Sequence, residues 1–127
     1  MTNTLTKYEN QLLAGWEEIY KRGQLTLWIL IALLDGQKHM VAIKGYLKSH
    51  TSNMLTADDQ SMYRALRRYA EADLVAFKVE QNSSGPDKKI YRLTPTGEHV
   101  LRQFVTRNVA ALVNEPVIQR IIGEDHE

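Results

Sequence analysis

Cysteine is absent from this 127-residue chain. Its absence excludes a disulfide framework, a thiolate metal site and a thiol nucleophile. Long apolar segments are also missing, since the longest strongly apolar run spans residues 25–34 and contains a threonine. That run is about half as long as a membrane-spanning helix, and residues 1–4 (MTNT) carry no basic segment typical of a signal peptide. We therefore expect a cytoplasmic protein with no membrane segment.

Clusters of catalytic or metal-binding side chains are equally scarce. The four histidines are scattered along the chain, with no pair four residues apart. Asp58 and Asp59 are explained by the favourable interaction of negative charge with a helix N-terminus, and Ser61 has no recognisable base beside it. We therefore expect no metal, no cofactor and no enzymatic activity.

The chain has the length of one domain and can bury a sufficient core without metal or disulfides. Its net charge of +1 conceals an asymmetry. Residues 21–92 hold 12 basic against 7 acidic side chains, whereas the two flanks together hold 4 against 8. A basic middle segment between acidic ends is compatible with a nucleic-acid-binding protein whose net charge is close to zero.

Apolar side chains recur at helical spacing in four segments before residue 73. The first helix is expected over residues 5–22 and ends near Arg22-Gly23, and the second covers residues 25–34. The third covers residues 40–47. The fourth is expected over residues 57–72, with Thr56 as its N-cap.

The segment after these helices alternates between apolar and polar residues. Residues 75–80 and 89–93 alternate as strands do, and residues 82–87 between them are rich in turn formers, which predicts a β-hairpin. Thr94-Pro95 then begins a long helix. A break at residues 114–116 precedes a last helical turn or two that ends near Gly123.

This order of elements predicts a mainly α protein with a small β-hairpin, a winged helix-turn-helix. Residues 1–93 would form the DNA-binding domain with an N-terminal helix, and residues 94–127 the dimerisation helix and tail of the same compact unit. In such a fold the third core helix enters the major groove and the hairpin lies along the backbone beside it.

The fourth helix and the hairpin supply the candidate DNA contacts. Gln60, Ser61 and Arg64 lie on the outward side of the helix and are expected to read base edges. The expected phosphate-binding residues are Tyr63, Arg67, Arg68, Lys78, Lys88, Lys89 and Arg92. We expect the helix and the hairpin to present these cations on one surface.

Three segments in this order resemble the PadR family of bacterial transcriptional regulators. Residues 22–30 (RGQLTLWIL) look like the opening of the family, and residues 61–68 (SMYRALRR) look like its recognition helix. Residues 88–97 (KKIYRLTPTG) look like its basic wing and the following glycine. Two positions depart from the family: Met40-Val41 stands where Gly-Tyr is common, and Asp73 replaces the glycine after the recognition helix.

The resemblance implies a homodimer held by the C-terminal helix, often together with the partner's N-terminal helix. One winged-helix core cannot bury the apolar stripes of residues 5–19 and 100–113, which supports an interface. The expected interface residues are Leu12, Trp16, Ile19, Leu101, Phe104, Val105 and Leu112. Relatives that sense drugs hold planar ligands between aromatic side chains at this interface, and Trp16 and Phe104 are the candidates here.

Two functions remain open at this point. The first is a dimeric repressor that binds a palindromic operator in double-stranded DNA and is released by a small-molecule effector. The second is a winged-helix protein-interaction or sensor module without useful DNA affinity, which the Met40-Val41 departure and the modest net charge favour.

Overall fold

The computed structural model describes residues 4–124 and has the predicted winged-helix class. Helix α1 (Lys7–Leu34) leads through strand β1 (Lys38–His39) into α2 (Met40–His50) and α3 (Asp59–Glu71). Strands β2 (Val75–Glu80) and β3 (Lys88–Leu93) form the hairpin. The chain ends with α4 (Pro95–Phe104), the π-helix η1 (Val105–Ala110), α5 (Ala111–Val113) and α6 (Pro116–Glu124).

Helix α1 is continuous where two helices were expected. It runs for 28 residues through Gly23, so the predicted end near Arg22 is wrong. One glycine inside a helix costs about 1 kcal/mol relative to alanine, which is less than the hydrogen bonds that a break would lose. The helix begins at a capping box, in which Thr6 Oγ1 accepts from the Glu9 N–H and Glu9 Oε1 accepts from the Thr6 N–H.

Helix α3 starts two residues later than predicted, because Asp58 and not Thr56 is its N-cap. Asp58 Oδ1 accepts a hydrogen bond of 2.7 Å from the Ser61 N–H. An ion pair of 2.5 Å between Lys44 Nζ and Asp59 Oδ1 joins α2 to this first turn. Threonine and aspartate both cap helices well, so the sequence alone did not show which of Thr56 and Asp58 is the N-cap.

The sheet has three strands in the order β1-β3-β2, all antiparallel. Strand β1 was not predicted, because two residues are too short for an alternating pattern. It pairs His39 with Ile90 on β3 and so ties the start of α2 to the hairpin. The adjacent Lys38 Nζ donates to the Ala32 carbonyl oxygen at 2.6 Å and thereby binds the end of α1.

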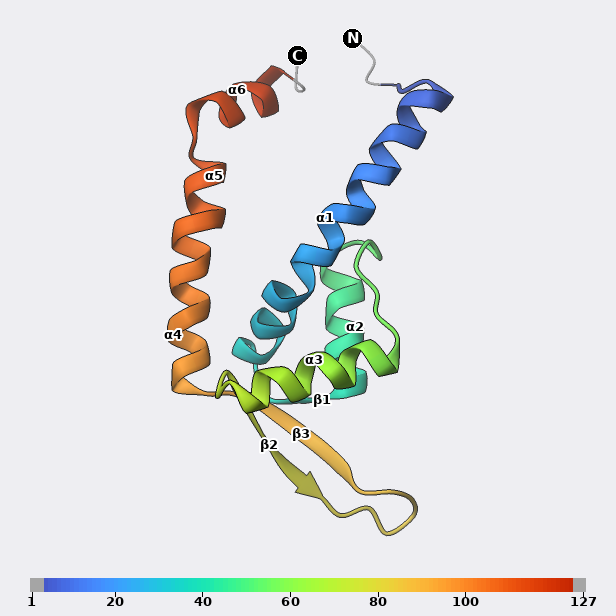
Figure 1. The fold of residues 1–127 in the computed structure, drawn as a ribbon, viewed down its shortest axis with the longest axis vertical. Helices are drawn as coiled ribbons and strands as arrows, with labels where there is room; N and C mark the ends of the chain where they lie inside the picture. Colours follow the sequence, from blue (N-terminus) through green and yellow to red (C-terminus); the bar gives the residue numbers. More distant parts are fainter. Residues whose placement is uncertain (1–3, 125–127) are drawn as a thin grey trace.

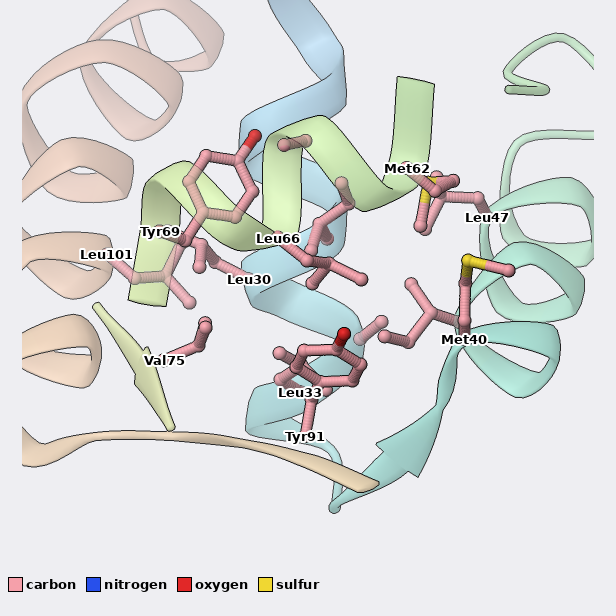
Figure 2. Packing of buried hydrophobic residues seen from close by; sticks show 14 of the residues in the cluster. Leu30, Leu33, Met40, Leu47, Met62, Leu66, Tyr69, Val75, Tyr91 and Leu101 are labelled. Carbon is pink, nitrogen blue, oxygen red and sulfur yellow. The ribbon is translucent and has the colours of Figure 1, made fainter. Parts of the chain in front are cut away.

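The core lies between the C-terminal half of α1, the helices α2 and α3, and the sheet (Figure 2). Its most fully buried large side chains are Ile29, Ile43, Leu47, Met62, Leu66 and Val75. Full burial of an aliphatic side chain contributes about 1.5–3 kcal/mol, so this cluster holds the three helices on the sheet.

A tight corner joins α3, β2 and α4. Asp73 adopts a left-handed conformation, with φ at 62°, in place of the glycine of relatives, and α3 still ends normally at Glu71. The Thr94 hydroxyl donates to the carbonyl oxygens of Asp73 and Leu74 and accepts from the Gly97 N–H at 2.9 Å. Thr94 is therefore the N-cap of α4, with Pro95 in the first position, as predicted.

The C-terminal helices extend away from the core (Figure 1). The segment α4–η1–α5 rises beside α1, while the N-terminal half of α1 projects beyond the winged-helix core. The helices break at Asn114 and Glu115, within the predicted break at residues 114–116, and Pro116 begins α6. Helix α6 then turns toward the N-terminal end of α1 (Figure 1). Helix α6 has nine residues and is longer than the expected turn or two.

Gly97→Ala tests the corner. A Cβ at position 97 would lie 2.0 Å from the Leu74 carbonyl oxygen, so backbone must move. We expect the free energy of unfolding to fall by about 3 kcal/mol in denaturant titrations. Gly23→Ala is the matched control, because a Cβ there meets nothing within 4 Å and should stabilise α1 by about 1 kcal/mol. Equal effects of the two substitutions would contradict this account.

Candidate nucleic-acid interface

Helix α3 has one buried face and one polar exposed face. Met62, Ala65, Leu66 and Tyr69 are buried, and the Tyr69 hydroxyl lies 2.7 Å from the Thr26 hydroxyl of α1. The opposite face exposes five of the predicted contact residues, namely Gln60, Tyr63, Arg64, Arg67 and Arg68. The helical period of about 100° per residue therefore placed these side chains correctly.

Ser61, the third predicted base-reading residue, lies at the edge of this face. It is half-buried and lines a cleft of about 510 Å³ between α1 and the start of α3. Glu18, Lys21 and Arg22 of α1 line the same cleft. The structure therefore places Ser61 apart from the centre of the exposed face at Gln60 and Arg64.

The hairpin does not present its cations on a single face. Val79 pairs with Lys89, Ala76 with Arg92, Lys78 with Ile90 and Glu80 with Lys88. Because side chains alternate along a strand, Lys89 shares the face of the buried Tyr91, and Lys78, Lys88 and Arg92 lie on the other face. The hairpin cations that were expected on one surface are therefore divided between its two faces, and Lys89 is separated from the other three.

Contacts within the hairpin and with β1 hold its polar groups in place. Lys89 Nζ lies 4.4 Å from the centre of the Phe77 ring, and that ring packs against Tyr91. His39 Nε2 lies 2.9 Å from Glu80 Oε1, and His39 Nδ1 lies 3.1 Å from the Lys89 carbonyl oxygen. The hairpin is therefore connected to β1 by side chains as well as by backbone.

A crevice of about 620 Å³ separates α3 from the hairpin. The first turn of α2 forms its floor with Val41 and Ala42, and Tyr63 of α3 forms one wall. The other wall is formed by residues 86–89 and Tyr91 of the hairpin. Sequence reasoning missed Val41 and Tyr91 as crevice residues, because only the unpredicted strand β1 brings α2 and the hairpin together.

Two ionisable groups at the interface have shifted pKa values. Burial raises the pKa of the Tyr91 hydroxyl, and the neighbouring Tyr63 raises it further, so Tyr91 stays a hydrogen-bond donor at neutral pH. Hydrogen bonds from the backbone and side chain of Ser61 lower the pKa of Asp58. The positive charges of Arg64 and Lys44 lower it further.

The predicted interface residues on α1 and the C-terminal helices are mostly exposed in one protomer. Trp16 is 73% exposed, and Leu12, Ile19, Phe104 and Leu112 are also accessible. Val105 is half-buried against the core. Leu101 of α4 is 3% exposed and packs into the protomer's own core, so it is not available to a partner.

The described residues contain neither a group that could hold a metal ion nor a helix long and apolar enough to cross a membrane. Phe104 borders a surface hollow of about 440 Å³ together with His99, Val100 and Gln103.

Comparison with known proteins identifies the family. A family model described as the transcriptional regulator PadR-like family matches residues 29–103, which is more than half of the chain. The chain belongs to this family. No curated protein matches the sequence.

Solved structures share the PadR fold. A PadR family transcriptional regulator from Eggerthella lenta superposes with a TM-score of 0.70 at 20% identity, over 96% of this chain and 98% of that one. A PadR-like regulator from Bacillus cereus gives 0.55 at 23% identity, over 74% and 95%. Bacillus subtilis PadR in complex with operator DNA gives 0.58 at 23% identity. That match covers 64% of this chain, which spans about half of the Bacillus subtilis chain (46%).

The residues that carry the PadR resemblance in the hairpin and α4 have structural roles. Tyr91 is buried in the core, Thr94 caps α4, and Gly97 permits the approach of the Leu74 backbone. Gln60 and Arg64 are exposed on α3 and lie outside this framework. The motif residues Tyr91, Thr94 and Gly97 therefore serve the fold.

Asp58→Asn tests the cap of α3. Asparagine keeps an acceptor at the N-cap but removes the charge. Because the folded-state pKa of Asp58 is lowered, its contribution is complete above the ordinary value of 3.8 and is lost as the pH falls through the lower folded-state value. In thermal melts we expect the wild type to exceed the variant at pH 6 and to lose that advantage toward pH 2. A difference in melting temperature that does not change with pH would contradict this account.

Proposed function

We propose that this PadR-family protein is a homodimeric repressor that binds a palindromic operator through α3 and the hairpin. The observation that carries the proposal is the division of α3 into a buried apolar face and an exposed face with Gln60, Arg64 and Arg67. Amide and guanidinium groups hydrogen-bond base edges in the major groove, and arginine does so bidentately with guanine. Such a face on the third helix of a winged-helix core matches the groove in shape and in chemistry.

The hairpin supplies the phosphate contacts of the proposal. Lys89, on the hairpin face of Tyr91, lines the crevice next to α3 and is the strongest candidate together with Tyr63, while Lys88 borders the crevice from the outer face of the hairpin. Lys78 and Arg92 lie on the outer face of the hairpin, and Arg68 lies at the edge of α3 on the side of Ser61. We propose that these three contact phosphates farther from the helix axis.

The dimer follows from exposed apolar area. The N-terminal half of α1 exposes Leu12, Trp16 and Ile19, and the C-terminal helices expose Phe104 and Leu112. Apolar surface of this extent marks an interface, and a two-fold axis there would set two α3 helices about one DNA turn apart. A planar effector held between Trp16 and the partner's copy of the C-terminal helices would change that spacing and release the operator.

Arg64→Ala and Lys89→Ala test the DNA interface. The probe is the duplex most enriched in selection from a random-sequence pool, compared with unrelated duplex in fluorescence-anisotropy titrations at several salt concentrations. Arg64→Ala should weaken binding to the selected duplex by about tenfold or more and bind unrelated duplex as before. Lys89→Ala should weaken binding to both and lower the salt dependence of log K by about one.

Arg120→Ala on α6 is the control and should leave DNA binding unchanged. Wild-type affinity of both test variants for both duplexes would refute the site assignment. Failure to recover any bound duplex would favour the protein-interaction module instead.

Trp16→Glu tests the dimer. The side chain is 73% exposed in one protomer, so its replacement should leave the core intact and place a charge in the interface. We expect sedimentation velocity to report a dimer for the wild type and a monomer for the variant at the same concentration. Val79→Glu on the exposed part of the hairpin is the control and should remain a dimer. A dimeric Trp16→Glu variant would contradict the proposed interface.

A further inference from the structure

His39 lies at the junction of strand β1, helix α2 and the hairpin. It is the N-cap of α2, but its side chain makes no hydrogen bond to the first turn of that helix. Its backbone pairs with Ile90 on β3, and its half-buried side chain reaches across β3 to Glu80 on β2. The side chain therefore binds the hairpin instead of capping the helix.

Both ring nitrogens of His39 face hydrogen-bond acceptors. Nδ1 lies 3.1 Å from the Lys89 carbonyl oxygen on β3, and Nε2 lies 2.9 Å from Glu80 Oε1 on β2. A neutral imidazole has one N–H and one lone pair, so it can donate to only one of these oxygens and turns a lone pair toward the other. The imidazolium has two N–H groups and satisfies both acceptors. The arrangement is therefore complementary to the protonated ring.

Glu80 is the acidic group that favours a charged ring at this place. The outer face of the hairpin, which carries Glu80, also holds three cations: Lys78, Lys88 and Arg92. These cations oppose a further positive charge, whereas the Glu80 carboxylate at hydrogen-bond distance attracts it. Lys38, the neighbour of His39 on β1, donates through Nζ to the carbonyl oxygens of Ala32 and Gly36.

Other ionisable groups border His39 from the crevice side. The crevice that His39 lines also holds the side chains of Tyr63, Asp87, Lys89 and Tyr91. Asp87 Oδ1 accepts from the Asn82 N–H at 3.3 Å and is thereby engaged in the turn of the hairpin. The first turn of α2 contributes no acidic residue. Charge on the ring is therefore coupled to Glu80 more closely than to the groups of the crevice.

We propose that His39 is a positioning residue that fastens the hairpin to β1 and α2 through a pH-dependent clasp, in which its ring binds Glu80 and the Lys89 carbonyl group. The protonated ring joins β1 to both strands of the hairpin. Loss of one proton to solvent breaks one of the two hydrogen bonds and turns a lone pair toward an acceptor. The hairpin is then held less firmly as the pH rises. Histidine changes charge between about pH 5 and 8, so the response falls in the physiological range.

The clasp acts on the part of the hairpin that lies nearest to α2. Strand β1 contributes only two residues to the sheet, so one side-chain contact is a large share of its attachment. The carbonyl group that the ring binds belongs to Lys89, whose ammonium group lies over Phe77 and lines the crevice. The clasp exists independently of DNA, and its effect on DNA affinity rests on the proposed function.

Amide hydrogen exchange in the full chain tests the clasp without DNA. Exchange rates of residues 38–39, 75–80 and 88–93 are measured by NMR at pH 5.5 and pH 8 and divided by the intrinsic rates at each pH, with the amides of α4 as an internal reference. We expect the protection of these strands in the wild type to be about three- to fivefold lower at pH 8. The change is modest because the two side chains are partly exposed. Equal protection at both pH values would overturn the proposal.

Glu80→Gln separates the clasp from a general effect of pH. The glutamine amide accepts from a protonated Nε2 through its oxygen and donates to a deprotonated Nε2 through its nitrogen, while the Nδ1–H stays bound to the Lys89 carbonyl group. Strand protection in this variant should therefore be equal at the two pH values and should exceed that of the wild type at pH 8.

His99→Gln is the matched control, because His99 is exposed on α4 and its replacement should leave the wild-type response unchanged. A Glu80→Gln variant that keeps the wild-type response, or a His99→Gln variant that loses it, would overturn the clasp.

Titrations of the selected duplex test the positioning role in the proposed DNA interface. Between pH 6 and pH 8 the affinity of the wild type should fall by a factor about three times larger than the affinity of Glu80→Gln, as measured by fluorescence anisotropy. An equal pH dependence in the two proteins would overturn the positioning role. Absence of DNA binding by the wild type would overturn the proposed function, and the exchange measurements would still decide the clasp.

Discussion

The close approach of Gly97 to the Leu74 backbone is the constraint on which the rest of the structure depends. At this corner the end of α3, the start of the hairpin and the start of α4 meet within a few residues. The Thr94 hydroxyl bridges the backbone on both sides and sets the direction of α4. The angle between the exposed face of α3 and the hairpin, and the position of the C-terminal helices, both follow from this junction.

The corner and the core leave α3 with one free face. The most buried side chains bind the inner face of α3 to α1 and the sheet, and no capping or packing task remains for Gln60, Arg64 or Arg67. Stability and the proposed recognition of DNA therefore depend on different residues of the same helix. This separation explains why the family resemblance follows framework residues such as Tyr91 and Gly97 and says little about the operator.

Local patterns in the sequence predicted much of this structure. The period of α3, the hairpin and the Thr94 cap are each set by neighbouring residues, so propensity and alternation reveal them. Two features depended on distant partners and were not predicted: the pairing of β1 with β3, and the crevice. The continuity of α1 was also not predicted, because Arg22-Gly23 resembles a break although one glycine costs a helix little. Strand alternation alone places Lys89 and Arg92 on opposite faces of the hairpin. The pairing register was needed to show which residues share each face.

The unbroken α1 mechanically couples the two ends of the protomer. Its 28 residues span about 40 Å, from the capping box at Thr6 to the end of the helix at Leu34. A tilt of about 5° at one end of a rod of that length displaces the other by roughly 3.5 Å. Since the Thr26 hydroxyl of α1 lies 2.7 Å from the Tyr69 hydroxyl of α3, such a tilt would carry a movement at the proposed dimer interface to the helix that we propose to face DNA.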